Sequence, residues 1–171
     1  MTSISYEGGT RTQYSSLEAW NVREDDFPKS GSLSEKINFF LRYAILAPSG
    51  HNTQPWLFKI VGNNAIEIHA DRSRALPVVD PDDRELIISC GATLYHLRLA
   101  ANHFSIVDEV RLLADKNNPD LARISLKDDD EGTIKKQAKR DAPLFEANTK
   151  RRSNRSSFEN RRLPDCLLAS L

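Results

Sequence analysis

One segment of the sequence combines small residues with hydrogen-bonding side chains. It runs from residue 47 to residue 56 and reads APSGHNTQPW. Small residues let a flat ligand approach the backbone, and the hydroxyl of Ser49 and the amides of Asn52 and Gln54 can bond the edge of a heteroaromatic ring. Because ordinary loops are also rich in Ser, Asn and Pro, this composition alone does not separate a ligand site from a plain loop.

A second segment, residues 151–155 (RRSNR), could bind phosphate. The planar arginine fork matches phosphate oxygens, and an adjacent serine hydroxyl adds a hydrogen bond. The alternative is a solvated basic patch, since residues 133–162 hold ten basic residues against three acidic ones. Over the whole chain, 24 basic residues balance 24 acidic ones. A net charge of zero argues against a polycation built for nucleic acid, so we expect no nucleic-acid partner.

Other kinds of chemistry find little support in the sequence. His96 and His103 are seven residues apart, but no third ligand stands at zinc spacing and there is no HExxH motif, so we expect no metal site. The Ser49-Gly50-His51 run is not a GxSxG elbow, and Cys90 lies in an apolar stripe. No GxGxxG or Walker-type loop occurs. We therefore assign no catalytic side chain from the sequence.

The first candidate segment lies between a predicted helix and a predicted hairpin. The helix begins at Ser32 or Ser34, with Glu35 as a capping signature, and stops at Ala47 before a proline. After the loop, residues 56–61 are predicted to form a buried strand, and residues 65–70 alternate as a second strand, so the pair resembles a hairpin.

The longest predicted helix covers residues 82–104, with Asp80 as N-cap and Pro81 at the first helical position. Its apolar residues step by three and four and should be buried: Leu86, Cys90, Leu94, Leu97 and Ala101. Further strands are expected at 106–113 and 122–126, a helix at 133–151, and a last helix opening at Pro164. The pattern predicts an α+β protein.

Length and composition are those of one soluble domain. The chain has 171 residues, of which 39% are hydrophobic and 28% charged, enough apolar material for one core. No apolar run approaches the roughly 18 residues of a membrane span, and the first residues lack the basic start and apolar stretch of a secretory signal. We therefore expect a cytoplasmic protein without a membrane partner.

Together the two candidate segments resemble the nitroreductase family of FMN-dependent oxidoreductases. Members carry an Arg-x-Ser-x-(Lys/Arg) flavin motif and a Pro-Ser-x-x-Asn-x-Gln-Pro-Trp segment, which residues 151–155 and 48–56 match. Residues 84–92 (RELIISCGA) and 97–100 (LRLA) look like the Acg-type, double-length branch. The resemblance covers residues 32–171 and implies a nitroreductase-like fold, an antiparallel-rich sheet flanked by helices.

The order of the motifs is the reverse of that in an ordinary single-length member, where the arginine motif comes first. The simplest account is two fused repeats, which divides the chain into a polar N-terminal arm (1–31), a first repeat (32–149) and the start of a second, truncated repeat (150–171). The fold is then expected to be incomplete. The flavin would lie within an internal pseudo-dimer whose second repeat is missing, or within a homodimer.

The family's flavin contacts transfer to this sequence position by position. Arg151 and Ser153 would bind the FMN phosphate with Arg152 nearby, and Arg155 would reach the pyrimidine edge of the ring. The loop before the first strand would line the other side. The cofactor-binding residues implied by the resemblance are Pro48, Ser49, Asn52, Gln54, Arg151, Arg152, Ser153 and Arg155.

The activity implied is two-electron transfer from NAD(P)H through FMN to a nitro or quinone-type acceptor. Part of the family's flavin contacts would fall beyond Leu171, so we expect the chain by itself to be inactive. The alternative is a protein that binds or sequesters flavin without substantial turnover, because the double-length branch can cover its flavin and exclude a second substrate.

Overall fold

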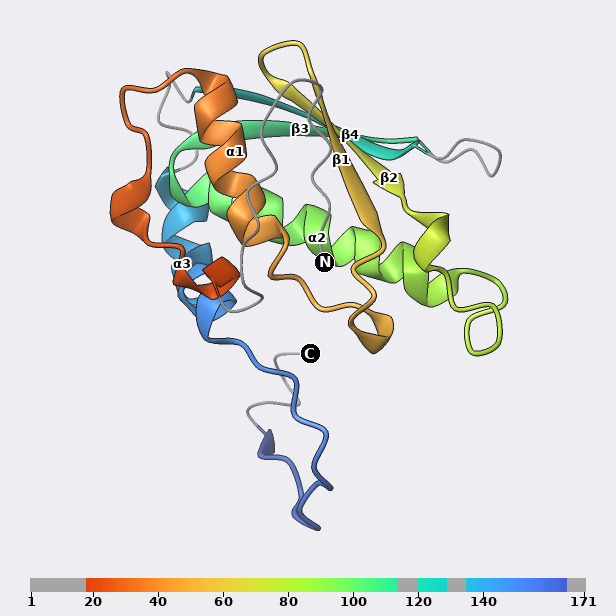
Figure 1. Ribbon diagram of the computed structural model, residues 1–171. Helices are drawn as coiled ribbons and strands as arrows, with labels where there is room; N and C mark the ends of the chain where they lie inside the picture. The colour runs from red at the N-terminus through yellow and green to blue at the C-terminus, as the bar shows by residue number, and fades with distance from the viewer. Residues whose placement is uncertain (1–17, 114–119, 129–134, 166–171) are drawn as a thin grey trace.

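The computed structural model describes residues 18–113, 120–128 and 135–165 (Figure 1). Its strands form one antiparallel sheet with the order β1-β2-β4-β3. The strands are β1 (Trp56–Val61), β2 (Ala65–Ala70), β3 (Ile106–Leu112) and β4 (Asp120–Asp128). The longer helices are α1 (Leu33–Ala44), α2 (Arg84–His103) and α3 (Lys135–Lys150). The expected α+β class with an antiparallel sheet and flanking helices is confirmed.

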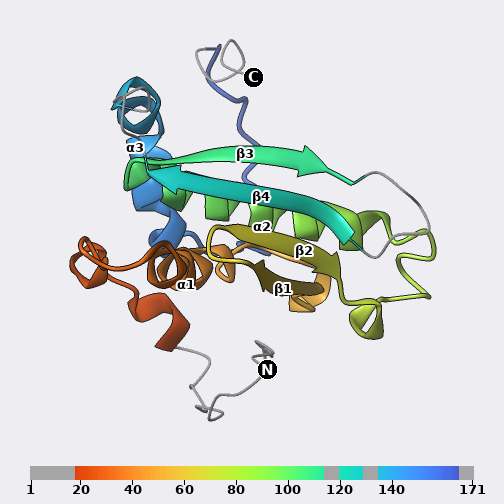
Figure 2. The same cartoon turned by 90° about the horizontal axis from the view of Figure 1, so that it is seen from above.

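Helix α2 is the central element. It crosses one face of the sheet and also contacts α1 and α3 (Figure 2). The sheet residues toward this side are fully buried apolar side chains of β2 and β4, namely Ile66, Ile68, Ile124 and Leu126. From Ile66 onward in β2 and from Ala122 onward in β4, buried residues alternate with less buried ones because successive side chains point to opposite faces. None of the helices described is long and apolar enough to cross a membrane.

The predicted start of α1 and the predicted hairpin are confirmed. Ser32 caps α1 in a full capping box. Its hydroxyl accepts a hydrogen bond from the Glu35 amide, and the Glu35 carboxylate accepts one from the Ser32 amide at 2.8 Å. In the hairpin, Trp56 pairs with Ala70 and Val61 with Ala65. The turn contains Gly62 with φ of 60°, a conformation that glycine adopts without steric cost.

Residues 18–31, which their composition assigned to a polar arm, pack against the helices in this structure. Two short 3₁₀ helices occur there, at Glu18–Asn21 and Glu24–Asp26, and Val22 is buried. Phe27 stacks on Phe104 with ring centroids 4.2 Å apart and also contacts Phe39 and Phe40. This aromatic cluster joins the segment to α1 and to the end of α2.

The start of α2 differs from the prediction. The helix begins at Arg84, and its N-cap residue Asp83 is in the left-handed region with no side-chain capping bond. Asp80 caps from a distance instead: its buried carboxylate accepts from the Leu86 amide at 3.0 Å. The extra turn between Pro81 and Asp83 moves the helix start but leaves Asp80 in its capping role. The other predicted elements end within three residues of the observed ones: α1 stops at Ala44, and β4 is longer than expected.

The predicted buried stripe of α2 is confirmed except at one position. Leu86, Cys90, Leu97 and Ala101 are buried, while Leu94 is only partly buried against the core. The helix has a second apolar surface that faces solvent in the described part of the chain, formed by Ile87, Ile88 and Tyr95. The expected helix after Pro164 lies outside the described residues beyond Asp165.

The capping role of Asp80 predicts an acid-sensitive contribution to stability. Burial raises the pKa of Asp80, but hydrogen bonds from the amides of Leu86, Glu85 and Arg84 outweigh it, so the pKa is lowered. A lowered pKa in the folded state stabilises the fold above the unfolded pKa, near 3.9, and the contribution disappears as pH falls through the folded pKa. Asp80→Asn should therefore melt below the wild type at pH 7, and the gap should close below about pH 4.

Melting temperatures across this pH range, followed by circular dichroism, provide the check. Asp82→Asn, an exposed neighbour, is the control and should follow the wild type throughout. A constant gap between Asp80→Asn and the wild type at all pH values would refute the charged cap.

Candidate functional site

The loop before β1 has a constrained backbone. Three non-glycine residues in it, His51, Asn52 and Gln54, have left-handed φ values of 49°, 58° and 51°. Such residues are uncommon and cost roughly 1–3 kcal/mol each, and they gather at functional sites. The Ser49 hydroxyl closes the loop by accepting from the Gln54 amide at 2.9 Å.

Contacts with α2 and with the turn after β2 hold this loop in place. The Gly50 amide donates to the Ser89 hydroxyl at 3.3 Å, and Arg74 Nη1 donates to the Thr53 carbonyl at 3.0 Å. A Cβ at Gly50 would stand 2.8 Å from a carboxylate oxygen of Glu85. The loop and the first turns of α2 therefore form one packed unit.

Cys90 fixes the end of the same loop from inside the core. Its thiol donates to the Pro55 carbonyl at 3.2 Å. Burial raises the pKa of Cys90 to about 12, so the thiol stays protonated at neutral pH and cannot serve as a nucleophile.

The C-terminus of α1 is bound by side chains from three different parts of the chain. A helix end leaves its last carbonyls without partners inside the helix. Here Thr93 Oγ1 donates to the Ala44 carbonyl at 2.7 Å, and Gln54 Nε2 donates to the Ile45 carbonyl at 3.3 Å. Arg151 Nη2 donates to the Leu46 carbonyl at 3.0 Å. These contacts bring the beginning of the arginine segment next to the loop.

The first arginines of the segment also cap α3. Arg152 Nη1 donates to the Thr149 carbonyl at 3.0 Å, and its guanidinium lies 4.1 Å from the centre of the Trp20 ring. Arg151 Nη1 donates to the Ser153 hydroxyl at 3.3 Å. Burial and the Arg152 charge lower the pKa of Arg151 from its usual value.

His96, Asn148 and Arg151 form a polar group at the inner side of this site: Asn148 and the Tyr43 backbone hydrogen-bond His96, and the Arg151 charge acts on the imidazole. Among the described residues, Arg151 Nε is buried without a hydrogen-bond partner. Burial and Arg151 lower the pKa of His96, which favours the neutral imidazole. The guanidinium of Arg151 reaches from this group to the Leu46 carbonyl, a neutral acceptor that takes one of its hydrogen bonds.

The remaining predicted site residues are exposed. Pro48 and Asn52 lie on the outside of the loop. Arg152, Ser153 and Arg155 are also exposed, and within the described residues Arg155 forms no hydrogen bond or ion pair. After α3 the chain leaves the body of the fold, so the end of the segment lies away from the loop (blue in Figure 1). The side chains of Ser49 and Gln54, in contrast, bind atoms of the loop and helix end.

Sequence reasoning missed several residues that organise the site: Trp20, Arg74, Ser89 and Thr93. A signal was present for two of them. Ser89, Thr93 and His96 are spaced by four and three, a polar stripe within the apolar helix α2. Because buried polar groups require hydrogen-bond partners, such a stripe indicates contacts with another part of the chain.

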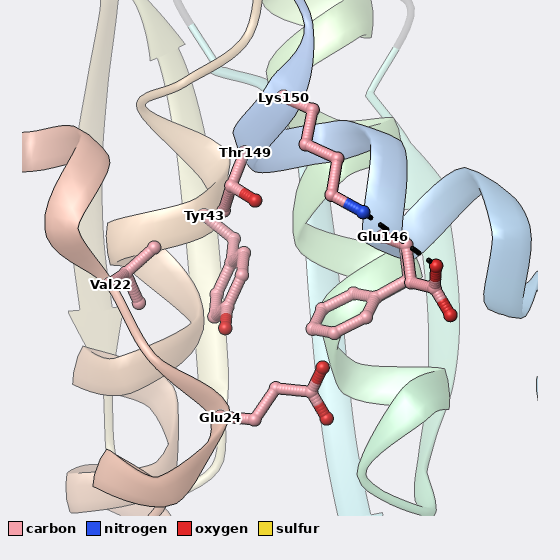
Figure 3. A pocket seen from close by; sticks show the side chains of 7 residues that line it. Val22, Glu24, Tyr43, Glu146, Thr149 and Lys150 are labelled. Carbon is pink, nitrogen blue, oxygen red and sulfur yellow. Dashed lines mark ion pairs between the residues drawn. The ribbon is translucent and has the colours of Figure 1, made fainter.

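A separate hollow of about 330 Å³ lies between residues 22–24, α1 and α3 (Figure 3). Its lining residues are Val22, Glu24, Tyr43, Phe145, Glu146, Thr149 and Lys150. Burial and Glu24 raise the pKa of Tyr43 to about 12, while Glu24 pairs with His103 at 2.9 Å. None of the predicted flavin ligands lines this hollow, so it is distinct from the loop and the arginine segment.

The sequence of this chain is similar to those of nitroreductases. A family model described as "Putative TM nitroreductase" matches residues 22–101. The chain is similar to "Putative NAD(P)H nitroreductase Rv3131" of Mycobacterium tuberculosis, with 32% identity over 73% of the chain and 35% of that protein. It is 30% identical to "Putative NAD(P)H nitroreductase acg" of the same organism, over 77% of the chain and 38% of that protein.

A shorter match, 36% identical, is to "Probable NAD(P)H nitroreductase PigM" of Serratia, over 37% of the chain and 18% of that protein. The chain thus spans about a third of the length of the curated relatives that match most of it. The predicted resemblance to this family is confirmed. The chain belongs to the nitroreductase family and is Acg-like.

Proposed function

We propose that this chain is part of an FMN-binding oxidoreductase that takes electrons from NAD(P)H and reduces a nitro or quinone-type acceptor. The family and the names of the relatives support the reaction class. The observation that carries the flavin site is the 3.0 Å contact between Arg151 and the Leu46 carbonyl. It joins the arginine segment to the loop whose sequence matches the family's ring-side segment.

The exposed donors of the two segments fit a flavin phosphate and ring. Arg152 and Ser153 would face the phosphate, since guanidinium and hydroxyl donors both bond phosphate oxygens. Arg155 would meet the pyrimidine edge, where a cation favours the anionic reduced ring, and Asn52 would bond the ring from the loop. When bound, FMN supplies the hydride and electron transfer, and the protein supplies its position and charge environment.

The proposal includes an organisation in two repeats. Residues 32–149 would form one repeat, and residues 150–171 would begin another. Flavin would then lie between parts of a pseudo-dimer, or between two copies of the chain. The exposure of residues 152–165 is compatible with this division, because the body of the fold is built from elements that end with α3 at Lys150.

Titration of the purified chain with FMN, followed by flavin fluorescence, tests the proposal. The exposed donors are few, so we expect weak binding that dialysis removes. A charge-assisted hydrogen bond contributes about 1.5–3 kcal/mol, so Arg155→Ala should weaken FMN binding about tenfold or more. Lys150→Ala is the matched control: Lys150 is an exposed neighbouring cation that pairs with Glu146 at 3.9 Å.

Oxidation of NADPH in the presence of excess FMN and a nitroaromatic or quinone tests the second half of the proposal. Turnover above that of free FMN supports an oxidoreductase. Binding without such turnover favours the flavin-sequestering alternative. If millimolar FMN leaves its fluorescence unchanged, or if Arg155→Ala binds like the wild type, the proposed site is wrong.

A further inference from the structure

The guanidinium of Arg151 is partly buried and hydrogen-bonds the protein, unlike the exposed arginines of the same segment. One Nη donates to the Leu46 carbonyl at 3.0 Å and the other to the Ser153 hydroxyl at 3.3 Å. Its Nε is buried beside the core. Arg152 and Arg155, in contrast, are exposed. Two of the three guanidinium nitrogens of Arg151 therefore donate to the protein itself, and the third is buried.

The position of Arg151 also matches the electrostatics of two helix ends. Unpaired carbonyls give a helix C-terminus a partial negative charge, which favours a nearby cation. Arg151 binds a carbonyl just beyond α1, and Arg152 binds the Thr149 carbonyl in the last turn of α3. The two arginines thereby connect both helix ends, with the Trp20 ring against the guanidinium of Arg152.

The Leu46 carbonyl is part of the connection between α1 and the loop. It lies two residues before Pro48, and the adjacent Ile45 carbonyl is held by Gln54 from the other end of the loop. Thr93 binds the Ala44 carbonyl from α2. If Arg151 were removed, the Leu46 carbonyl would lose its side-chain donor, and the arginine segment would lose this hydrogen bond to the end of α1.

We infer that Arg151 is a positioning residue rather than a ligand of the flavin phosphate. Its hydrogen bonds form a lock that holds the arginine segment against the end of α1. This lock fixes the separation between the loop and the exposed flavin donors. The inference rests on the proposed flavin site for its functional part. The lock itself rests on the hydrogen bonds to Leu46 and Ser153 and on the half-buried location of the guanidinium.

Comparing FMN with riboflavin separates a positioning residue from a phosphate ligand, since riboflavin has the same ring without the phosphate. Arg151→Ala should weaken binding of both flavins by the same factor, about tenfold or more. Ser153→Ala should weaken FMN binding and leave riboflavin binding unchanged. Lys150→Ala, which removes the preceding exposed cation, should change neither.

Hydrogen exchange measured by mass spectrometry tests the lock without any flavin. Peptides covering residues 45–55 contain amides held within the loop, including those of Gly50 and Gln54. Their exchange should become about tenfold faster in Arg151→Ala and stay unchanged in Lys150→Ala. Arg151→Lys keeps a cation that can reach one acceptor but not two, so it should give an intermediate rate. If Arg151→Ala does not fold, Arg151→Lys carries both measurements.

The possible outcomes distinguish the lock from the flavin site. If the wild type binds neither flavin, the proposed function fails, while faster exchange in Arg151→Ala still supports the lock. A loss of FMN affinity alone, with riboflavin binding and exchange unchanged, would show that Arg151 is a phosphate ligand and overturn the inference. Unchanged exchange in Arg151→Ala, or faster exchange with both flavin affinities intact, would overturn it as well.

Discussion

Leu97→Asp is expected to leave the protein largely unfolded. Leu97 is fully buried in α2, a helix that packs against α1, α3 and the sheet, and the buried residues in the described part of the chain include no lysine or arginine. An uncompensated buried charge costs about 3–5 kcal/mol, a large part of the 5–15 kcal/mol by which a typical domain is stable. Urea unfolding followed by far-ultraviolet circular dichroism measures the loss.

The same substitution at two less buried positions of α2 provides the comparison for Leu97→Asp. Ile88 is 59% exposed, so Ile88→Asp should change the unfolding free energy by no more than about 0.5 kcal/mol. Leu94 is partly buried, and Leu94→Asp should fall between the two. If Leu97→Asp unfolds at the same urea concentration as Ile88→Asp, the assignment of the buried face of α2 is wrong.

Phe40→Ala should be the most costly truncation in the aromatic cluster. Phe40 is fully buried, and its ring lies 5.9 Å from that of Phe27 and 6.1 Å from those of Phe39 and Phe104. Removing a buried phenylalanine ring loses its transfer free energy and leaves a cavity, together about 3–5 kcal/mol. The loss would also weaken the attachment of residues 18–31, because Phe40 is one of the three rings that Phe27 contacts.

Phe158→Ala is the matched control, because Phe158 is 96% exposed. Its unfolding free energy should equal that of the wild type within about 0.5 kcal/mol. Chemical denaturation of both variants, with the same protein concentration and buffer, gives the comparison. Equal losses in the two variants would mean that the cluster contributes little to stability.

Local patterns account for the parts of the fold that the sequence predicted. The hairpin follows from alternation on either side of Gly62, and α1 follows from the Ser32–Glu35 capping pair, because each signal lies within a few residues of the element that it specifies. The start of α2 was misplaced because the Asp80 carboxylate reaches amides four to six residues further along, beyond any nearest-neighbour capping rule. Leu94 has the spacing of a core residue, but no element covers it completely.

The candidate site was predictable in its chemistry but not in its assembly. The residue types of the loop and the arginine segment were evident from the sequence. Their connection depends on a carbonyl at Leu46 and a side chain at Arg151, which are over a hundred residues apart. Backbone acceptors carry no sequence signature, since every residue has the same carbonyl group. The contacts made by Arg74 and Thr93 were missed for this reason.

The hydrogen bond between Cys90 and the Pro55 carbonyl has a consequence for oxidative chemistry. Oxidants and alkylating reagents attack the thiolate form of cysteine. Burial keeps the Cys90 thiol protonated and inaccessible to these reagents as long as α2 stays packed against the loop. Modification at Cys90 must therefore wait for the helix and the loop to separate. The rate at which the Cys90 thiol is modified therefore reports how often the structure opens between α2 and the loop before β1.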